Sequence, residues 1–220
     1  MRGFESGCKR LIMPNFSLII FSREPVPGHT KTRLIPRYGA AGAAAIHSQL
    51  LERTVSTGLT ATTKVAAYID GALSSGYFSQ PKNTQLLTLH PQTGADLGER
   101  MHNALQETLK AADRALLVGS DCAVHTAAAL QTAASALDEC DMVFTPAEDG
   151  GYVLVGARQS AANRLRAAFA GIDWGTPQVM AQTRQRLAAA HLSCTEMPTL
   201  WDIDEPADVE RALAAGLIQL

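Results

Sequence analysis

Short apolar runs and longer helical patterns alternate along this chain, and no other feature restricts its fold as strongly. The helical patterns cover about 40–57, 98–111, 126–137, 161–169 and 177–190, with a last helix beginning near Pro206. The runs short enough to be strands lie at 18–21, 65–69, 86–89, 115–118, 142–145 and 153–155. Such alternation predicts the α/β class, in which helices flank a mainly parallel central sheet.

The segment from Thr145 to Gly156 departs from this order, because it joins two strand-like runs without room for a crossover helix. Parallel neighbours need such a crossover, so we expect a locally antiparallel strand here. No Ser-rich or Pro-rich linker divides the 220 residues, a length that suits one domain with a sizeable core. We expect this domain to occupy residues 15–220, and residues 1–14 to form a disordered extension.

The composition argues against several classes of protein. The net charge of -2 leaves no broad cationic surface, so nucleic acid is not an expected partner. No apolar run approaches about 18 residues and no signal peptide is recognisable, so we expect a cytoplasmic protein without a membrane span. The absence of a CxxC pair argues against a zinc site or a redox motif among the cysteines, which are Cys8, Cys122, Cys140 and Cys194.

A loop with glycine, prolines and several cations follows the first predicted strand. Pro25, Pro27 and Gly28 prevent the strand from continuing, and Lys31 and Arg33 follow where a helix can begin. Backbone N–H groups at such a turn attract anions, and the planar guanidinium of Arg33 suits phosphate oxygens. The segment therefore predicts a phosphate-binding loop. The alternative is a solvated basic loop.

A single carboxylate follows the predicted strand 115–118. Ligands bind open α/β sheets at the carboxyl ends of the strands, so Asp121 is placed to meet Mg²⁺ and the phosphates that the ion bridges. Mg²⁺ usually takes one or two carboxylates from the protein and its other ligands from water and phosphate. The alternative is that Asp121 closes a turn or caps the helix that begins near Thr126.

Two carboxylates and two glycines follow the strand 142–145. Glu148 and Asp149 can bind sugar hydroxyls or act as a base, and Tyr152 can stack on a ring. Gly150 and Gly151 permit close approach of the backbone to a ligand. The alternative is a simple hairpin, since Asp-Gly is a strong turn signal.

A further pair of carboxylates precedes the last helix. Asp202 and Asp204 are alternate residues of an extended segment, so their side chains share a face. For Asp204 we favour capping of the helix, with Pro206 in its first turn and Asp208 near its positive end. Asp202 is the expected second metal ligand, beside Asp121.

These segments together resemble the DUF2064 family. The resemblance covers about Phe16 to Leu213 and lies in PVPGHTKTRL, DLGERM, GSDC, PAEDGGYVLVG and WDIDEPADVE, which begin at residues 25, 96, 119, 146 and 201. The family belongs to the nucleotide-diphospho-sugar transferase superfamily, which has the GT-A fold, and its members are described as glycosyltransferases. The resemblance therefore implies a single GT-A domain.

Carried over by position, the resemblance implies a role for each motif. The nucleotide phosphates would lie at Gly28, Lys31, Thr32 and Arg33, and the nucleotide also near Leu97, Gly98 and Arg100. Asp121 would bind the metal, and the sugar or acceptor pocket would contain Glu148, Asp149, Gly150, Gly151 and Tyr152. One departure is the sequence Ala123, Val124, His125, where the family pattern has Pro, Gly and Leu.

These observations predict a glycosyltransferase that uses Mg²⁺ (or Mn²⁺), a nucleotide-sugar donor and a small-molecule acceptor. Glu148 and Asp149 are the expected catalytic residues. One alternative is a nucleotidyltransferase, similar to guanylyl- or cytidylyltransferases, that releases pyrophosphate. Another is a nucleotide-binding regulator without turnover.

Overall fold

A single sheet forms the centre of the computed structural model, which describes residues 15–71, 76–78 and 87–220. The expected extension 1–14 lies outside the described residues. The sheet order is β3-β2-β1-β4-β6-β5-β7. The seven strands are β1 (Ser17–Arg23), β2 (Val65–Asp70), β3 (Thr88–Pro91), β4 (Arg114–Gly119), β5 (Met142–Pro146), β6 (Tyr152–Arg158) and β7 (Cys194–Glu196).

All neighbouring strands pair in parallel except at β6, which is antiparallel to both β4 and β5. The prediction of an antiparallel strand after β5 is therefore confirmed. The reversal places the amino end of β6 beside the carboxyl ends of β4 and β5. Residues at the start of β6 thus share the edge of the sheet where ligands bind in α/β folds.

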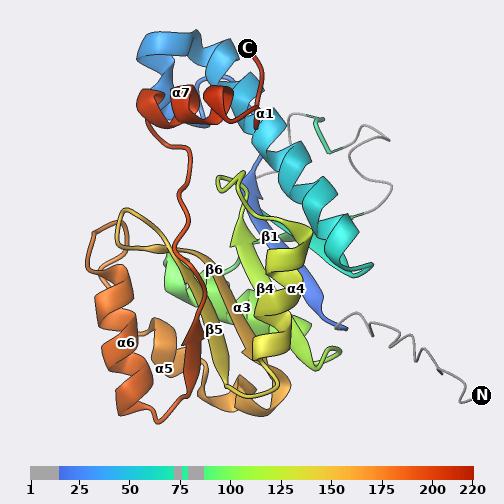
Figure 1. The fold of residues 1–220 in the computed structure, drawn as a ribbon, viewed down its shortest axis with the longest axis vertical. Helices are drawn as coiled ribbons and strands as arrows, with labels where there is room; N and C mark the ends of the chain where they lie inside the picture. The colour runs from blue at the N-terminus through green and yellow to red at the C-terminus, as the bar shows by residue number, and fades with distance from the viewer. Residues whose placement is uncertain (1–14, 72–75, 79–86) are drawn as a thin grey trace, which may run out of the picture.

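Helices cover both faces of the sheet (Figure 1), which confirms the predicted α/β class. α1 (Ile35–Ala61) and α4 (Ala127–Ala136) pack on one face. The other face carries α3 (Leu97–Thr108), α5 (Arg166–Phe169) and α6 (Val179–Ala189). The last helix, α7 (Pro206–Ala214), lies beyond the strands at the upper end of the molecule in Figure 1 and packs against α1.

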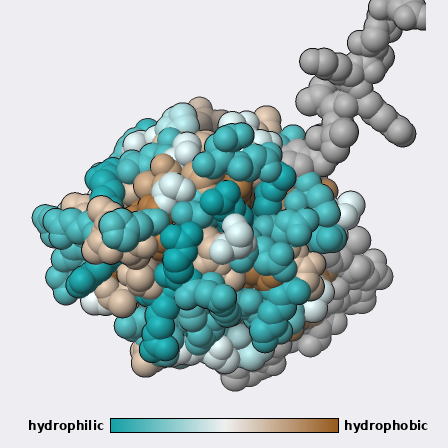
Figure 2. Space-filling model, turned by 90° about the horizontal axis from the view of Figure 1, so that it is seen from below, coloured by the Kyte–Doolittle hydropathy of each residue, from teal (hydrophilic) through white to brown (hydrophobic). Residues whose placement is uncertain are grey.

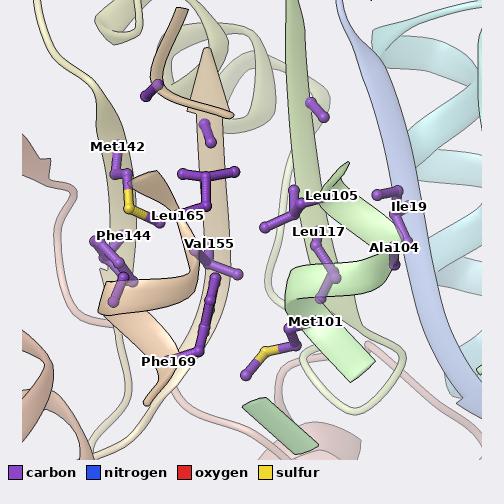
Figure 3. Close-up of a cluster of buried hydrophobic side chains, with 14 of the residues drawn as sticks. Ile19, Met101, Ala104, Leu105, Leu117, Met142, Phe144, Val155, Leu165 and Phe169 are labelled. Atoms are coloured by element: carbon purple, nitrogen blue, oxygen red, sulfur yellow. The ribbon is translucent and has the colours of Figure 1, made fainter. Parts of the chain in front are cut away.

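The strands are buried on both sides, as the apolar runs of the sequence require. Successive side chains of β1 point to opposite faces, so Leu18 and Ile20 pack with α1 and α4, whereas Ile19 packs with α3. Figure 3 shows the apolar core on the face that carries α3, where Phe144 and Val155 lie in one cluster with side chains from α3 and α5.

Several boundaries differ from the predicted ones. α1 begins at Ile35, but Gly39 is non-helical (φ 69, ψ 167), so the continuous helix starts near the expected residue 40. The predicted helix 161–169 is divided into a 3₁₀ helix, Gln159–Arg164, and the short α5. β3 ends at Pro91 rather than Leu89, and the first residue of the predicted strand 86–89 lies outside the described residues.

β7 was not predicted, because its three residues, Cys194–Glu196, include no apolar run. From β7 the chain runs in an extended path to α7 at the carboxyl ends of the strands (Figure 1). The opposite end of the molecule presents mainly hydrophilic side chains (Figure 2). Within the described part of the chain, no helix has the length and apolar character that crossing a membrane requires.

Candidate functional site

A cavity of about 720 Å³ opens at the carboxyl ends of β1, β2 and β4. The loop after β1, the start of β6, the start of α3 and the segment before α7 complete its walls. The volume is in the range of sites that bind small ligands. The cavity brings together Lys31, Thr32, Arg33, Leu97, Arg100, Asp121, Tyr152 and Asp202 of the predicted site, and does not include Glu148 or Asp149 in its lining.

Lys31 connects three segments of this site. Its Nζ donates to Asp204 Oδ1 at 2.7 Å and to the Ile203 carbonyl at 2.6 Å, and lies 2.8 Å from Asp121 Oδ1. The side chain is only 6% exposed, and the backbone is left-handed (φ 49). Burial by itself would lower the pKa of Lys31, but the carboxylates of Asp121 and Asp204 outweigh it and raise the pKa. Lys31 is therefore a charged link between the loop after β1 and the segment before α7.

Asp121 lies where the sequence placed it, just beyond β4. Burial favours its neutral form, but Lys31 and then His47 outweigh burial and hold the pKa of Asp121 below its usual value. His47, a buried residue of α1, places Nδ1 3.8 Å from Asp121 Oδ1. The backbone carbonyl of Asp121 accepts from Ile203 N at 3.1 Å. Asp121 is thus an ionised carboxylate, held in place and still 42% exposed to the cavity.

The segment before α7 adds two further carboxylates, Asp202 and Asp204. The prediction that Asp204 caps α7 is wrong. Glu205, not Asp204, is the N-cap of α7, in a capping box with Asp208. Asp204 turns toward Lys31 instead. Asp202 lines the cavity, where its burial and the nearby charges of Asp204 and then Asp149 raise its pKa to about 6.

These carboxylates fit a divalent cation. No group of three or more His, Cys, Asp or Glu side chains in the described residues is close enough to hold a metal ion on its own. Mg²⁺ and similar ions, however, commonly use one or two protein carboxylates together with phosphate and water. Within the same residues no Lys, Arg or His pairs with Asp202, and its burial, followed by the negative charges of Asp204 and Asp149, raises its pKa. Asp121 and Asp202 are accordingly the candidate ligands for such an ion.

The loop after β1 contains a glycine with positive φ, an exposed arginine and a buried lysine. Gly28 has φ 84, a conformation that favours glycine, and has free space around it. Thr32 and Arg33 begin a 3₁₀ helix and line the cavity. The Arg33 side chain is 67% exposed and lies 3.5 Å from Glu205 and 3.8 Å from Asp204. Arg33 therefore remains accessible to a phosphate, whereas Lys31 is buried against carboxylates.

The start of α3 contributes two of its three expected residues to the cavity. Leu97 is 45% exposed, and Arg100 joins Asp70 through Nη1 at 2.8 Å. Gly98 instead serves packing, since a Cβ there would lie 2.6 Å from the Trp174 ring. Asp96 caps the helix by accepting from Glu99 N at 2.7 Å.

Glu148 and Asp149 lie outside the lining of the cavity. Arg211 of α7 binds both carboxylate oxygens of Glu148, at 2.8 and 3.1 Å, and stacks 4.1 Å from the Trp201 ring centroid. This hydrogen bond lowers the pKa of Glu148, which weakens it as a base at neutral pH. Asp149 accepts from Gly151 N at 2.9 Å, as in a turn. Their catalytic role stays a prediction.

Gly150 and Tyr152 are held by packing. Gly150 has φ 92, and a Cβ there would lie 2.3 Å from the Pro177 carbonyl oxygen. Tyr152 lines the cavity, but its ring contacts Phe144 and Trp174 edge-on, and burial raises its pKa. Its ring is therefore already partnered by aromatic residues of the protein.

His125, which departs from the family pattern, is buried (5% exposed), and burial lowers its pKa to about 4. Below about pH 6.5 His125 is therefore protonated in the unfolded chain but stays neutral in the folded protein. The free energy of unfolding should accordingly fall from pH 6.5 to 4. The shift corresponds to about 3 kcal/mol at pH 4. Chemical denaturation of His125→Gln should show a shallower loss than the wild type over this range.

Exposed His29 offers the matched control. His29→Gln should follow the wild-type acid profile. An unchanged slope in His125→Gln would contradict the assignment of His125 as a buried neutral imidazole.

Sequence reasoning missed several residues of the cavity. Asp70 ends β2 and pairs with Arg23 at 2.9 Å and with Arg100 at 2.8 Å. Gln92 follows β3 and donates to the Ser22 and Tyr68 carbonyls at 3.3 and 3.0 Å. The position of Asp70 and Gln92 directly after strands was the signal that could have found them. His47 lies inside a helix and gave no such signal.

Two comparisons with known sequences bear on the chain. The family model described as "Uncharacterized protein conserved in bacteria (DUF2064)" matches residues 54–176, more than half of the chain. No curated protein matches.

Solved structures share the fold. A "putative nucleotide-diphospho-sugar transferase" from Desulfovibrio desulfuricans is 28% identical with a TM-score of 0.80, over 86% of this chain and 82% of that one. A 4-diphosphocytidyl-2C-methyl-D-erythritol synthase from Anaerococcus prevotii is 11% identical with a TM-score of 0.60, over 92% and 96%. A Mycobacterium tuberculosis protein in complex with manganese is 13% identical with a TM-score of 0.56, over 91% and 98%. The fold is thus that of the nucleotide-diphospho-sugar transferases.

Proposed function

The chain belongs to the DUF2064 family, and we propose that it is a glycosyltransferase that uses a nucleotide-sugar donor, a divalent cation (Mg²⁺ or Mn²⁺) and a small-molecule acceptor. One observation carries this proposal: a single cavity is lined by the ionised Asp121, by Asp202 with its raised pKa, and by the accessible Arg33. The name of the Desulfovibrio neighbour, at 28% identity, supports a nucleotide sugar as donor.

Different residues of the cavity would bind different parts of a diphosphate and its cation. Asp121 and Asp202 would hold the cation, which when bound neutralises charge on the departing diphosphate. Arg33 would donate to phosphate oxygens, assisted by backbone N–H groups of the loop. Lys31 keeps Asp121 and Asp204 in place, since it contacts both. Catalysis would then consist mainly of positioning and electrostatic stabilisation of the leaving group.

A thermal-shift screen of nucleotides and nucleotide sugars, with and without Mg²⁺ or Mn²⁺, tests this proposal. A ligand that binds the native state raises its stability. We expect nucleoside diphosphates and at least one nucleotide sugar to raise Tm, and the shift to require the cation. A panel with no cation-dependent shift would contradict the proposal.

Nucleotidyl transfer is the second candidate, and one observation favours it. The carboxylate pair that suggested recognition of sugar hydroxyls, Glu148 and Asp149, does not line the cavity. Proteins of the same fold include nucleotidyltransferases. The leaving group separates the two activities, because only nucleotidyl transfer releases pyrophosphate from a triphosphate.

Glu148→Gln tests whether Glu148 is catalytic. The exposed ion pair with Arg211 contributes little to stability, so Tm should stay within about 2 °C. If Glu148 is the base, turnover should fall about 100-fold or more while nucleotide binding is unchanged. Arg211→Gln breaks the same ion pair and leaves the carboxylate in place. An equal loss in both variants would show that Glu148 only positions the loop.

A further inference from the structure

The ammonium group of Lys31 lies among oxygen atoms of the candidate metal site. Lys31 Nζ is 2.8 Å from Asp121 Oδ1 and donates to Asp204 Oδ1 at 2.7 Å. The Ile203 carbonyl accepts from the same nitrogen at 2.6 Å. Asp121 follows β4, whereas Ile203 and Asp204 belong to the segment before α7. One positive charge therefore lies where the two segments that carry the candidate metal ligands meet.

Lys31 reaches Asp121 from the buried side of the carboxylate. The Lys31 side chain is 6% exposed, and its backbone has φ 49, a conformation that a residue other than glycine keeps only where its surroundings hold it. Asp121 Oδ1 is buried against Lys31 Nζ and lies 3.8 Å from His47 Nδ1, although the Asp121 side chain as a whole is 42% exposed. A cation that entered the cavity would therefore approach the exposed part of this carboxylate, with the charge of Lys31 behind it.

The two candidate metal ligands differ in how far the protein neutralises them. Lys31 contacts Asp121 and Asp204 directly. No Lys, Arg or His in the described part of the chain pairs with Asp202, and its burial, followed by the charges of Asp204 and Asp149, raises its pKa. Asp202 thus lacks a cation of the protein, whereas Asp121 already has one.

We propose that Lys31 is an internal counter-ion that competes with the divalent cation for Asp121, so that the cation binds tightly only together with a nucleotide. Two positive charges beside one carboxylate repel each other, and the burial of Lys31 limits the screening of this repulsion by water and salt. The phosphates of a nucleotide would bring negative charge into the cavity and offset the repulsion. The inference rests on the proposed function and deepens it, because it describes how the metal site of that function is regulated.

Mn²⁺, titrated without nucleotide and followed by electron paramagnetic resonance and calorimetry, is the probe. Lys31→Met removes the competing charge and should bind Mn²⁺ at least fivefold more tightly than the wild type. Lys31→Gln should do the same, and it covers the case in which Lys31→Met fails to fold, because Gln keeps an N–H donor for the Ile203 carbonyl. Arg33→Gln is the matched control. It removes a cation that lies 3.8 Å from Asp204 but is 67% exposed, so the affinity for Mn²⁺ should change less than twofold.

The same titration with GDP or UDP present measures the coupling between cation and nucleotide. At least one of these nucleotides should raise the affinity of the wild type for Mn²⁺ at least tenfold, and this factor should be at least fivefold smaller in Lys31→Met. Failure of both Lys31 variants to bind Mn²⁺ more tightly than the wild type would overturn the competition and leave the metal site in place. Equal tightening in Arg33→Gln would also overturn it, since the effect would then belong to the general charge of the cavity. Absence of Mn²⁺ binding in the wild type and all variants, even with nucleotide, would contradict the metal site of the proposed function and the competition with it.

Discussion

Replacing Asp121 with Asn should abolish the gain in nucleotide affinity that Mg²⁺ or Mn²⁺ provides while leaving the fold intact. Asn keeps the size of the side chain and an oxygen that can accept from Lys31, and Lys31 retains Asp204 and the Ile203 carbonyl. Loss of a charged ligand should weaken cation-dependent binding of nucleoside diphosphates by about 10- to 100-fold, equivalent to roughly 1.5 to 3 kcal/mol. Calorimetry with and without the cation measures this difference.

Asp138 supplies the control for this experiment. It pairs with Arg114 at the surface and does not line the cavity. Asp138→Asn should bind nucleotide and cation like the wild type. Unchanged cation dependence in Asp121→Asn would remove Asp121 from the metal site.

Gly150→Ala should destabilise the protein by about 3 kcal/mol or more. The methyl group would lie 2.3 Å from the Pro177 carbonyl oxygen, and φ is 92. Overpacking costs about 1 to 3 kcal/mol and a left-handed backbone about 1 to 2 kcal/mol more. Chemical denaturation checks the value.

Gly175→Ala isolates the contribution of the backbone. Gly175 has φ 77, but a methyl group at this position would have no atom within 4 Å. The variant should therefore lose only about 1 to 2 kcal/mol. Equal losses in the two variants would show that the contact with Pro177 is not the cause, and would reopen a direct role for Gly150 in ligand binding.

The fold could be predicted largely from the sequence because its strands are apolar on both faces and its helices lie between them. The turn between β5 and β6 was too short for a crossover, so even the antiparallel strand was predictable. β7 was not, since its three residues form no apolar run and their pairing with β5 is not visible in the local sequence. The kink at Gly39 has φ 69, a conformation that glycine adopts readily, and the predicted helix began just beyond it, at about residue 40.

The candidate site was predicted less completely, for a physical reason. Position after a strand identified Asp121 and the loop with Arg33, because backbone topology fixes the place of such residues. The ion-pair partner of each charged side chain, however, depends on which segments far apart in the sequence lie side by side in the fold. Lys31 meets Asp204, 173 residues away, and Glu148 meets Arg211 across 63 residues. No local pattern could show that Asp204 is not the cap of α7 or that the carboxylate of Glu148 is occupied.

Phosphorus NMR of the products tests the central claim most directly. The protein is incubated with Mg²⁺ and a panel of nucleotide sugars, or with nucleoside triphosphates, each with and without sugar phosphates as acceptors. The proposed glycosyl transfer predicts that a nucleotide sugar is converted to a nucleoside diphosphate or monophosphate, that triphosphates are not consumed, and that Asp121→Asn stops the reaction. Release of pyrophosphate from a triphosphate, dependent on Mg²⁺ and on Asp121, would contradict glycosyl transfer and establish nucleotidyl transfer instead.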